Sequence, residues 1–519
     1  MPRICLLFFA ALTLLRAQPG PLAGLDDYIA RAMRTFDVPG VAVAVVHEGQ
    51  VVLAEGYGVR RIDWPERVDE HTLFGIASNT KAFTTAALAI LVDEGKLHWD
   101  DRVIDHLDWF RMYDPYVTRE ITIRDLLTHR SGMGLGEGDL LFFPPSTYTR
   151  FEIIRRLRYM KPASSFRSRY AYDNLLYLAA GQIIEAVTGR RWEDFIRQRI
   201  FRPLGMTGSN TSVADFHPGD NYATPHSIVE GKLTPLTPAR IDNTAPAGAI
   251  NSGVSDMAKW IIVQLNRGAI PGTDRRLFSE RQSREMWSPQ TIIPIPDLPP
   301  ALAALHTDFD AYGLGWGLRQ YRGHKLVGHT GGLPGYVSQV TMVPDLQLGV
   351  VVLTNQESGG MFNSVTYRIL DSYMHAPETD WVRVFHDVAQ QQRAKADVEM
   401  RQQASARAAD SKPSLPLEKY AGHYTDAWYG AIDIALEHGK LVMRFSHSPA
   451  LTGDLEHWQY DTFVARWRDR SLAADAYVTF SLKADGSIRQ VNMLPISPLT
   501  DFSFDFQDLL LTPDKDEGK

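Results

Sequence analysis

A serine and a lysine lie three positions apart in G-I-A-S-N-T-K-A-F-T, residues 75–84. An apolar run follows, and residues at i and i+3 share a helical face, so Ser78 and Lys81 are expected to point the same way. A serine hydroxyl becomes a nucleophile once a base takes its proton, and a desolvated lysine can be that base. N–H groups at the start of the helix would also favour a developing oxyanion. The alternative is an N-cap serine followed by a surface lysine.

A second pair of polar residues occurs in R-Y-A-Y-D-N-L-L-Y-L-A-A, residues 169–180. Tyr172 and Asn174 are two positions apart at an expected loop-to-helix junction, so both side chains could face a cleft. A tyrosine beside a lysine can act as a general base where its phenolate is favoured. The alternative is that Tyr172 packs in the interior and Asn174 caps the helix that follows.

A third candidate is the glycine-rich stretch G-H-T-G-G-L-P-G-Y, residues 328–336. Its polar and small residues, His329, Thr330, Gly331 and Gly332, stand where one strand is expected to end and pairing to resume. Small residues on an edge strand let a substrate backbone approach closely. Histidine titrates near neutral pH, so His329 is expected to gain or lose a charge there. The alternative is a glycine-rich hairpin with a surface histidine.

The order of these three motifs is informative. S-x-x-K, then Y-x-N, then H-T-G resembles the serine β-lactamase and penicillin-binding protein superfamily, most closely its class C β-lactamase-like branch, which includes family VIII esterases and D-aminopeptidases. Intervening phrases such as I-T-I-R-D-L-L-T-H-R-S-G-M and P-A-G-A-I-N-S-G-V-S-D-M-A fit the same pattern. The resemblance runs from about residue 25 to 375. It favours the chemical interpretation of all three motifs.

The resemblance implies a role for each polar side chain of the first two motifs. Ser78 would be the acylated nucleophile, and Lys81 would activate it. Tyr172 would share the general acid and base work, and Asn174 would hydrogen-bond substrate or the lysine.

For the third motif, the resemblance implies an oxyanion hole formed by the backbone N–H groups of Ser78 and Gly332. Residues 329–331 would line the strand that pairs with substrate. One departure is notable: His329 stands where true β-lactamases usually carry a lysine. A lysine offers a permanent cation to a substrate carboxylate and a neutral histidine does not, so the resemblance favours an esterase or peptidase over a β-lactamase.

The elements that would position these residues follow from the hydrophobic pattern. Strands are expected around a turn in residues 41–59 and again within residues 312–354, with helices at 78–95, 152–160 and 173–188. Strands at both ends of the region suggest one mixed sheet completed by the chain's return. The resemblance implies an α+β class: a mostly antiparallel sheet flanked by helices, plus a helical lobe, with the cleft between them.

Composition changes after about residue 380. Residues 376–416 are expected to form a helical linker, because they are Ala/Gln/Arg-rich and end in S-K-P-S-L-P. Residues 417–519 alternate short apolar runs with turns, which predicts a small all-β barrel or sandwich. This last part resembles the lipocalin-like domain that follows the hydrolase domain in some relatives. The hydrolase domain itself is expected at residues 18–375.

The N-terminus reads as an export signal. A basic residue, an apolar stretch and Ala17 precede Q-P-G, which predicts a signal peptide over residues 1–17. The alternative is a buried N-terminal helix. Cys5 is the only cysteine and lies inside this segment, so the mature chain would hold neither a disulfide nor a thiol nucleophile. No later stretch predicts a membrane span, and the expected location is secreted or periplasmic.

Composition and missing motifs narrow the function further. The 519 residues, with 44% hydrophobic content and a net charge of −7, are enough for two or three folded domains and disfavour nucleic acid or an anionic membrane as partner. No G-x-S-x-G elbow, H-E-x-x-H helix or G-K-[ST] loop occurs, and the histidines are too scattered to indicate a metal site. The glycine-rich run S-G-M-G-L-G-E-G-D, residues 131–139, is interpreted as a loop.

The leading hypothesis is an exported serine hydrolase that works by acyl transfer without a cofactor. Its substrate would be a small ester, an amide or a D-amino-acid peptide. The alternatives are β-lactamase or D-Ala-D-Ala carboxypeptidase activity, or a penicillin-binding sensor that is acylated without turnover. The acyl group, the leaving group, the oligomeric state and the role of the C-terminal domain are left open by the sequence.

Overall fold

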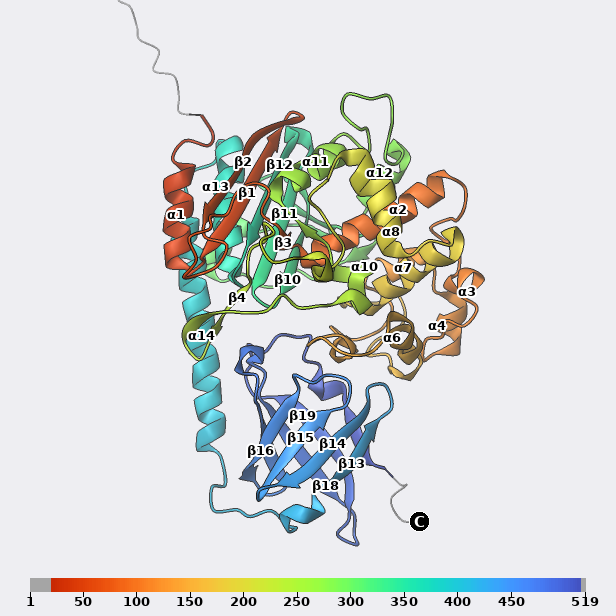
Figure 1. The fold of residues 1–519 in the computed structure, drawn as a ribbon, viewed down its shortest axis with the longest axis vertical. Coiled ribbons are helices and arrows are strands. Elements are labelled where there is room, and N and C mark those ends of the chain that lie inside the picture. The colour runs from red at the N-terminus through yellow and green to blue at the C-terminus, as the bar shows by residue number, and fades with distance from the viewer. Residues whose placement is uncertain (1–19, 515–519) are drawn as a thin grey trace, which may run out of the picture.

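The computed structural model describes residues 20–514, so the signal peptide expected at residues 1–17, with Cys5, lies outside the described residues. The chain forms an α+β part, a closed β-barrel beneath it in Figure 1, and one long helix, α14 (Trp381–Ser405), that runs beside both. This confirms the expected fold class. Within the described residues, no helix is long and apolar enough to cross a membrane.

The α+β part is built on one eight-stranded sheet in the order β2-β1-β12-β11-β10-β9-β8-β7. Every pairing in it is antiparallel, so the expectation of a mixed sheet is wrong and that of a mostly antiparallel one is confirmed. The strands are β1 (Gly40–His47), β2 (Gln50–Gly58), β7 (Thr291–Ile292), β8 (Asp310–Tyr312), β9 (Gly317–Tyr321), β10 (His324–Leu333), β11 (Tyr336–Val343) and β12 (Leu348–Thr354).

Helices cover both faces of this sheet (Figure 1). Alternate residues of β1 point to opposite faces, so its two sets of apolar side chains join two separate cores. One core lies under α11 (Val254–Leu265), and the other under α1 (Leu25–Thr35) and α13 (Gly359–Tyr373). Because both faces are covered, β1 and β12 are continuous apolar runs.

The helical lobe packs beside the sheet around α2 (Thr80–Asp93). All but the last two residues of α2 are buried, as expected of a helix that is apolar on every side. Against it lies α7 (Leu175–Thr188), which ends at Gly189 with φ of 67°, the left-handed C-cap that glycine adopts at least cost. The remaining helices are α3 (Val103–His106), α4 (Pro115–Glu120), α5 (Ile123–Leu126), α6 (Arg150–Arg156), α8 (Trp192–Ile196), α9 (Arg202–Leu204), α10 (Ala245–Gly248) and α12 (Glu280–Met286).

Two short two-stranded sheets complete this part. They pair β3 (Phe74–Gly75) with β6 (Asn251–Ser252) and β4 (His226–Val229) with β5 (Lys232–Pro235). The first of them is directly followed by the S-x-x-K motif, so it fixes where that motif begins.

The C-terminal part is a closed barrel of eight consecutive antiparallel strands, which decides between the barrel and the sandwich expected from the sequence. Its strands are β13 (Gly422–Asp426), β14 (Gly430–Glu437), β15 (Lys440–Phe445), β16 (Thr452–Gln459), β17 (Thr462–Trp467), β18 (Ala476–Leu482), β19 (Ile488–Pro495) and β20 (Leu510–Pro513).

The barrel docks on the helical lobe through hydrogen bonds to backbone groups. Arg156 donates to the carbonyl of Trp428 at 2.7 Å, and the amide of Thr147 donates to the carbonyl of His447 at 2.9 Å. The hydroxyl of Tyr148, which is buried, donates to the carbonyl of Tyr429. The loop between β19 and β20 reaches further, into the cleft that holds the three motifs.

Candidate active site

Ser78 lies on a 3₁₀ turn, Ala77–Asn79, that leads directly into α2. The residue before it, Ala77, has φ of 47°, a left-handed conformation that costs a non-glycine residue about 1–3 kcal/mol. This turn is tied to the sheet, because Ser338 on β11 donates to the carbonyl of Ile76 at 2.8 Å and accepts from Asn79 at 2.8 Å. The serine is therefore held at a strained junction between strand and helix.

Lys81 is completely buried on the first turn of α2 and faces Ser78. Its Nζ donates to Ser78 Oγ at 3.0 Å, to Asn174 Oδ1 at 2.7 Å and to the carbonyl of Ala247 at 3.2 Å. The two residues thus share a helical face as their spacing predicted, and the alternative of a surface lysine is wrong.

The buried surroundings of Lys81 disfavour its charged form. Desolvation lowers the pKa of Lys81 to about 7, although the carboxylates of Asp139 and Asp173 act in the opposite direction. The ammonium also lies over the rings of Tyr172 and Tyr177, at 4.8 and 5.3 Å from their centroids. A lysine with such a pKa is partly neutral at physiological pH and can accept a proton.

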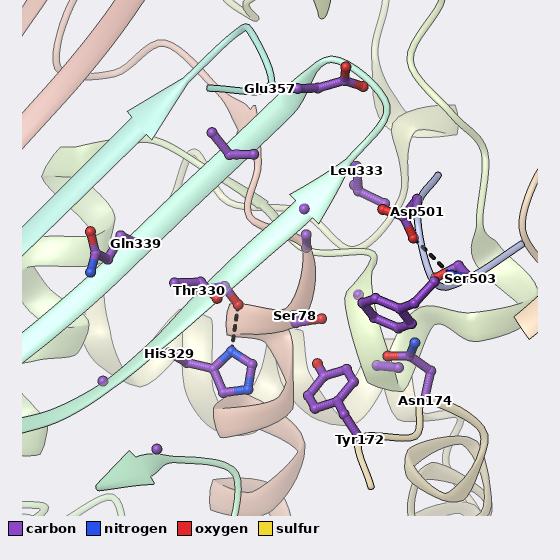
Figure 2. A pocket seen from close by; sticks show the side chains of 18 of the residues that line it. Ser78, Tyr172, Asn174, His329, Thr330, Leu333, Gln339, Glu357, Asp501 and Ser503 are labelled. Carbon is purple, nitrogen blue, oxygen red and sulfur yellow. Dashed lines mark hydrogen bonds between the residues drawn. The ribbon is translucent and has the colours of Figure 1, made fainter. Parts of the chain in front are cut away.

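Tyr172 points its hydroxyl toward Ser78 (Figure 2). Desolvation raises the pKa of Tyr172 well above its ordinary value, and hydrogen bonding with Ser78 only partly opposes this. The phenolate that a tyrosine general base would need is therefore not favoured in the resting site. As a neutral hydroxyl, Tyr172 is suited to passing a proton between Ser78 and a leaving group.

Asn174 occupies the N-cap position of α7, yet its side chain makes no capping hydrogen bond. It bridges two buried groups: Oδ1 accepts from Lys81 at 2.7 Å, and Nδ2 donates to Asp139 Oδ2 at 2.9 Å. The alternative of a helix-capping asparagine is wrong, and the side chain belongs to the site.

The H-T-G motif lies on the part of β10 that borders the cleft. β10 pairs with β9 only as far as Gly328, whereas its pairing with β11 continues to Leu333, so residues 329–333 have a free edge. Because a two-residue connection, Pro334–Gly335, closes the hairpin, alternation of the ladder directs the N–H of Gly332 away from β11. That N–H is available beside Ser78.

His329 is held from both sides. One ring nitrogen, Nε2, lies 2.8 Å from the hydroxyl of Tyr312, and the other, Nδ1, lies 2.5 Å from the carbonyl of Thr330. This assigns the proton to Nδ1 and makes Nε2 an acceptor. Desolvation lowers the pKa of His329 to about 3. The expectation that it changes charge near neutral pH is wrong.

The three motifs line one cleft with a cavity volume of about 870 Å³. The cleft walls carry the carboxylates of Asp310, Glu357 and Asp501, and one arginine, Arg319. That arginine donates to the carbonyl of Leu305 at 3.0 Å. The cleft therefore offers more negative than positive charge to a ligand.

Two polar residues of this site did not stand out in the sequence. Asp139, at the end of the glycine-rich run taken as a loop, is fully buried and contacts Asn174. Ser503 comes from the barrel and donates to the same carboxylate at 2.9 Å. The closely spaced glycines before Asp139 indicated an unusual backbone conformation near it. Nothing in the sequence indicated that Ser503 belongs to the site.

Two families account for most of the sequence. Residues 25–373 match the family described as Beta-lactamase, and residues 406–513 match a domain of unknown function, DUF3471. The chain belongs to the β-lactamase family. This is a family of serine hydrolases, and the matched residues include all three motifs of the cleft.

Relatives with assigned names include hydrolases. Unguisins hydrolase ungD′ of Aspergillus campestris is 29% identical over 426 residues, which are 79% of this chain and 76% of that protein. Unguisins hydrolase ungD of Aspergillus violaceofuscus is 29% identical over 481 residues, 86% of this chain and 83% of that protein. Protein flp of Staphylococcus aureus is 28% identical over 347 residues, 64% of this chain and 63% of flp.

Solved structures share the fold. The octameric penicillin-binding protein homologue from Pyrococcus abyssi aligns with a TM-score of 0.60 at 22% identity, over 94% of this chain and 99% of that one. The D-amino acid amidase from Ochrobactrum anthropi SV3 aligns with a TM-score of 0.55 at 23% identity, over 68% of this chain and 99% of that one.

Proposed function

We propose that this protein is a serine hydrolase that forms an acyl-enzyme on Ser78. The observation that carries the proposal is the 3.0 Å hydrogen bond between Lys81 Nζ and Ser78 Oγ in a buried setting that lowers the pKa of Lys81 to about 7. A neutral lysine at this distance is within reach of the hydroxyl proton.

In this mechanism Lys81 takes the proton of Ser78 while Oγ attacks the carbonyl carbon of the substrate. The N–H groups of Ser78 and Gly332 stabilise the oxyanion that forms. Tyr172 relays the proton to the leaving group as the bond from the carbonyl carbon breaks. Water then attacks the acyl carbon along the same proton path in reverse, which restores the serine.

The substrate we propose is a small ester, an amide or a short D-amino-acid peptide, without a requirement for a carboxylate. Support comes from the charges around the cleft: His329 is neutral where a β-lactamase-like site would place a cation, and Asp501 adds a carboxylate to the cleft lining. The named hydrolases among the relatives support hydrolysis as the reaction class. Hydrolysis of a β-lactam or of a D-Ala-D-Ala peptide is the second candidate, supported by family membership.

The direct test is the intact mass of the protein after incubation with a fluorophosphonate and, separately, with a penicillin. We expect one covalent adduct that is lost in Ser78→Ala, and hydrolysis of p-nitrophenyl esters or D-amino-acid amides by the wild type only. Release of penicillin product would favour the β-lactamase candidate, and a persistent penicillin adduct would favour an acceptor without turnover. Absence of any Ser78-dependent adduct or turnover would overturn the proposal.

We also propose that the protein is exported, on the strength of the N-terminal sequence. Expression of the full chain in a bacterium, followed by fractionation and N-terminal sequencing, tests this. Export predicts a mature chain that begins near residue 18 outside the cytoplasm, and a cytoplasmic protein that retains Met1 would contradict it.

A further inference from the structure

A loop of the barrel enters the cleft of the hydrolase domain. In Figure 2, Ser503, from the segment between β19 and β20, lies above Asn174, and Asp501 lies on the far side of Ser503. Asp501 is exposed, but Ser503 and Asp505 are buried against the helical lobe. The barrel thus contributes side chains to the surroundings of the proposed catalytic residues.

The contact that matters is made by Asp139. Its Oδ2 accepts two hydrogen bonds, one from Asn174 Nδ2 at 2.9 Å and one from Ser503 Oγ at 2.9 Å. The carboxyl group is fully buried, and its Oδ1 has no hydrogen-bond partner among the described residues. A single buried oxygen therefore joins the barrel to the residue that contacts Lys81.

The barrel also holds the backbone on either side of Asp139. Asp505 accepts hydrogen bonds from the amide of Gly138 at 2.6 Å and from that of Leu140 at 3.1 Å. Gly138 has φ of 86°, and a Cβ there would lie 2.4 Å from Met160 Cε, so this backbone has little freedom to move elsewhere. Side chain and main chain of Asp139 are both positioned by one barrel segment.

The arrangement decides which way the amide of Asn174 points. An asparagine amide carries a donor at one end and an acceptor at the other. With its Nδ2 engaged by a carboxylate, its Oδ1 must face Lys81, where it can accept a hydrogen bond. The reversed amide would direct two N–H groups at the ammonium of Lys81 and leave Asp139 facing an oxygen.

We propose that Asp139 and Ser503 are positioning residues for the hydrolase reaction, so that docking of the barrel orients Asn174 and, through it, Lys81. This inference rests on the proposed function of Ser78 and Lys81. It gives the C-terminal barrel a role in catalysis: Ser503 completes a chain of hydrogen bonds that runs through Asp139 and Asn174 to Lys81.

Electrostatics agree with this role. Burial raises the pKa of Asp139 to about 8, while hydrogen bonds from Ser503 and Asn174 lower it. The nearby charges that act on Asp139 are Lys81, Asp501 and the equally buried Asp505.

Because the pKa of Asp139 lies above that of Lys81, the Asp139 carboxyl group is largely protonated over the range in which Lys81 titrates. Lys81 also feels the carboxylate of Asp173 and lies near the neutral imidazoles of His129 and His329. Loss of the Ser503 hydroxyl therefore acts on the orientation of Asn174, and the acid limb of the rate profile should keep its wild-type midpoint.

The test measures the rate of fluorophosphonate labelling of Ser78 from pH 5 to 9 in the full-length protein. We expect Ser503→Ala to lower the maximal rate at least tenfold without moving the acid limb, while Ser503→Thr, which keeps the hydroxyl, stays within about threefold of wild type. Gln507→Ala, an exposed change in the same segment at a residue that does not line the cleft, is the control for disturbance of the loop. Melting curves report whether each variant is folded.

Asp139→Asn separates the hydrogen bonds from the charge. Its amide oxygen can still accept from Asn174 and Ser503, so we expect a folded protein that is labelled within about threefold of the wild-type rate, with an unmoved acid limb. A wild-type labelling rate in Ser503→Ala would overturn the inference. So would a loss in Ser503→Ala that threonine fails to restore. If Ser503→Ala does not fold, an Asp139→Asn protein labelled more than tenfold slower than wild type, although it keeps the acceptor oxygen, would overturn it as well. Failure of the wild type to be labelled would instead count against the proposed function.

Discussion

At the scale of single residues, the pH dependence of acylation should report the protonation state of Lys81. Its pKa is lowered to about 7, so its neutral, proton-accepting form appears as the pH rises through that value. We expect the labelling rate of Ser78 to rise with a midpoint near pH 7. Lys81→Arg, which stays protonated throughout, should lower the rate by about 10²–10⁴-fold, the usual contribution of a general base.

His329 provides the control for this measurement. Because its pKa lies near 3 and both ring nitrogens are hydrogen-bonded, it does not titrate in the range where Lys81 does. His329→Gln should leave the midpoint of the acid limb unchanged even if the rate itself changes. A wild-type rate that is flat from pH 5 to 9 would contradict the assignment of Lys81 as the base.

At the scale of elements, the approach of β10 to the serine turn sets the geometry of the oxyanion site. A Cβ on Gly331 would lie 2.2 Å from the carbonyl oxygen of Ile76 and 2.9 Å from Ala77 Cβ, so β10 or the turn would have to move. We expect Gly331→Ala to cost about 1–3 kcal/mol of stability, as overpacking does, and to lower the labelling rate at least about tenfold. Thermal melting and labelling measure the two effects.

The neighbouring glycine is a matched control for stability. A Cβ on Gly332 would meet no heavy atom within 4 Å, because this position faces the open cleft. Gly332→Ala should therefore melt with the wild type. If Gly331→Ala also melts with the wild type and is labelled at the same rate, the close packing of β10 on the serine turn does not position the oxyanion site.

At the scale of the whole molecule, the sequence predicted contacts between nearby residues and missed contacts between residues far apart in the chain. Local spacing placed Ser78 and Lys81 on one helical face, and the resemblance placed Tyr172 and Asn174 beside them. The sequence did not indicate that Asp139 and Ser503 belong to the site, because they are 364 positions apart in two different parts of the chain. The periodicity of a sequence predicts helices and strands, and it does not predict a contact over such a separation. The lowered pKa of His329 was missed for a related reason, since its desolvation depends on packing around the cleft.

The docked barrel should also make stability depend on pH. Burial and the nearby Asp139 raise the pKa of Asp505 well above its ordinary value, although it accepts two amide hydrogen bonds. A carboxyl whose pKa is higher in the folded state binds more protons there than in the unfolded state. Its contribution to stability is therefore present at low pH and is lost as the pH rises through the folded pKa, by at most about 1.4 kcal/mol per pH unit.

We expect Asp505→Asn, which keeps a hydrogen-bond acceptor but removes the charge, to reduce the fall in melting temperature between pH 5 and pH 8. Asp501→Asn, a change at an exposed carboxylate of the same loop, should leave that fall as it is in the wild type. Melting curves at four pH values between 5 and 8 measure both. An Asp505→Asn protein whose melting temperature falls as steeply as that of the wild type would mean that this buried carboxyl pair does not govern the pH dependence of docking.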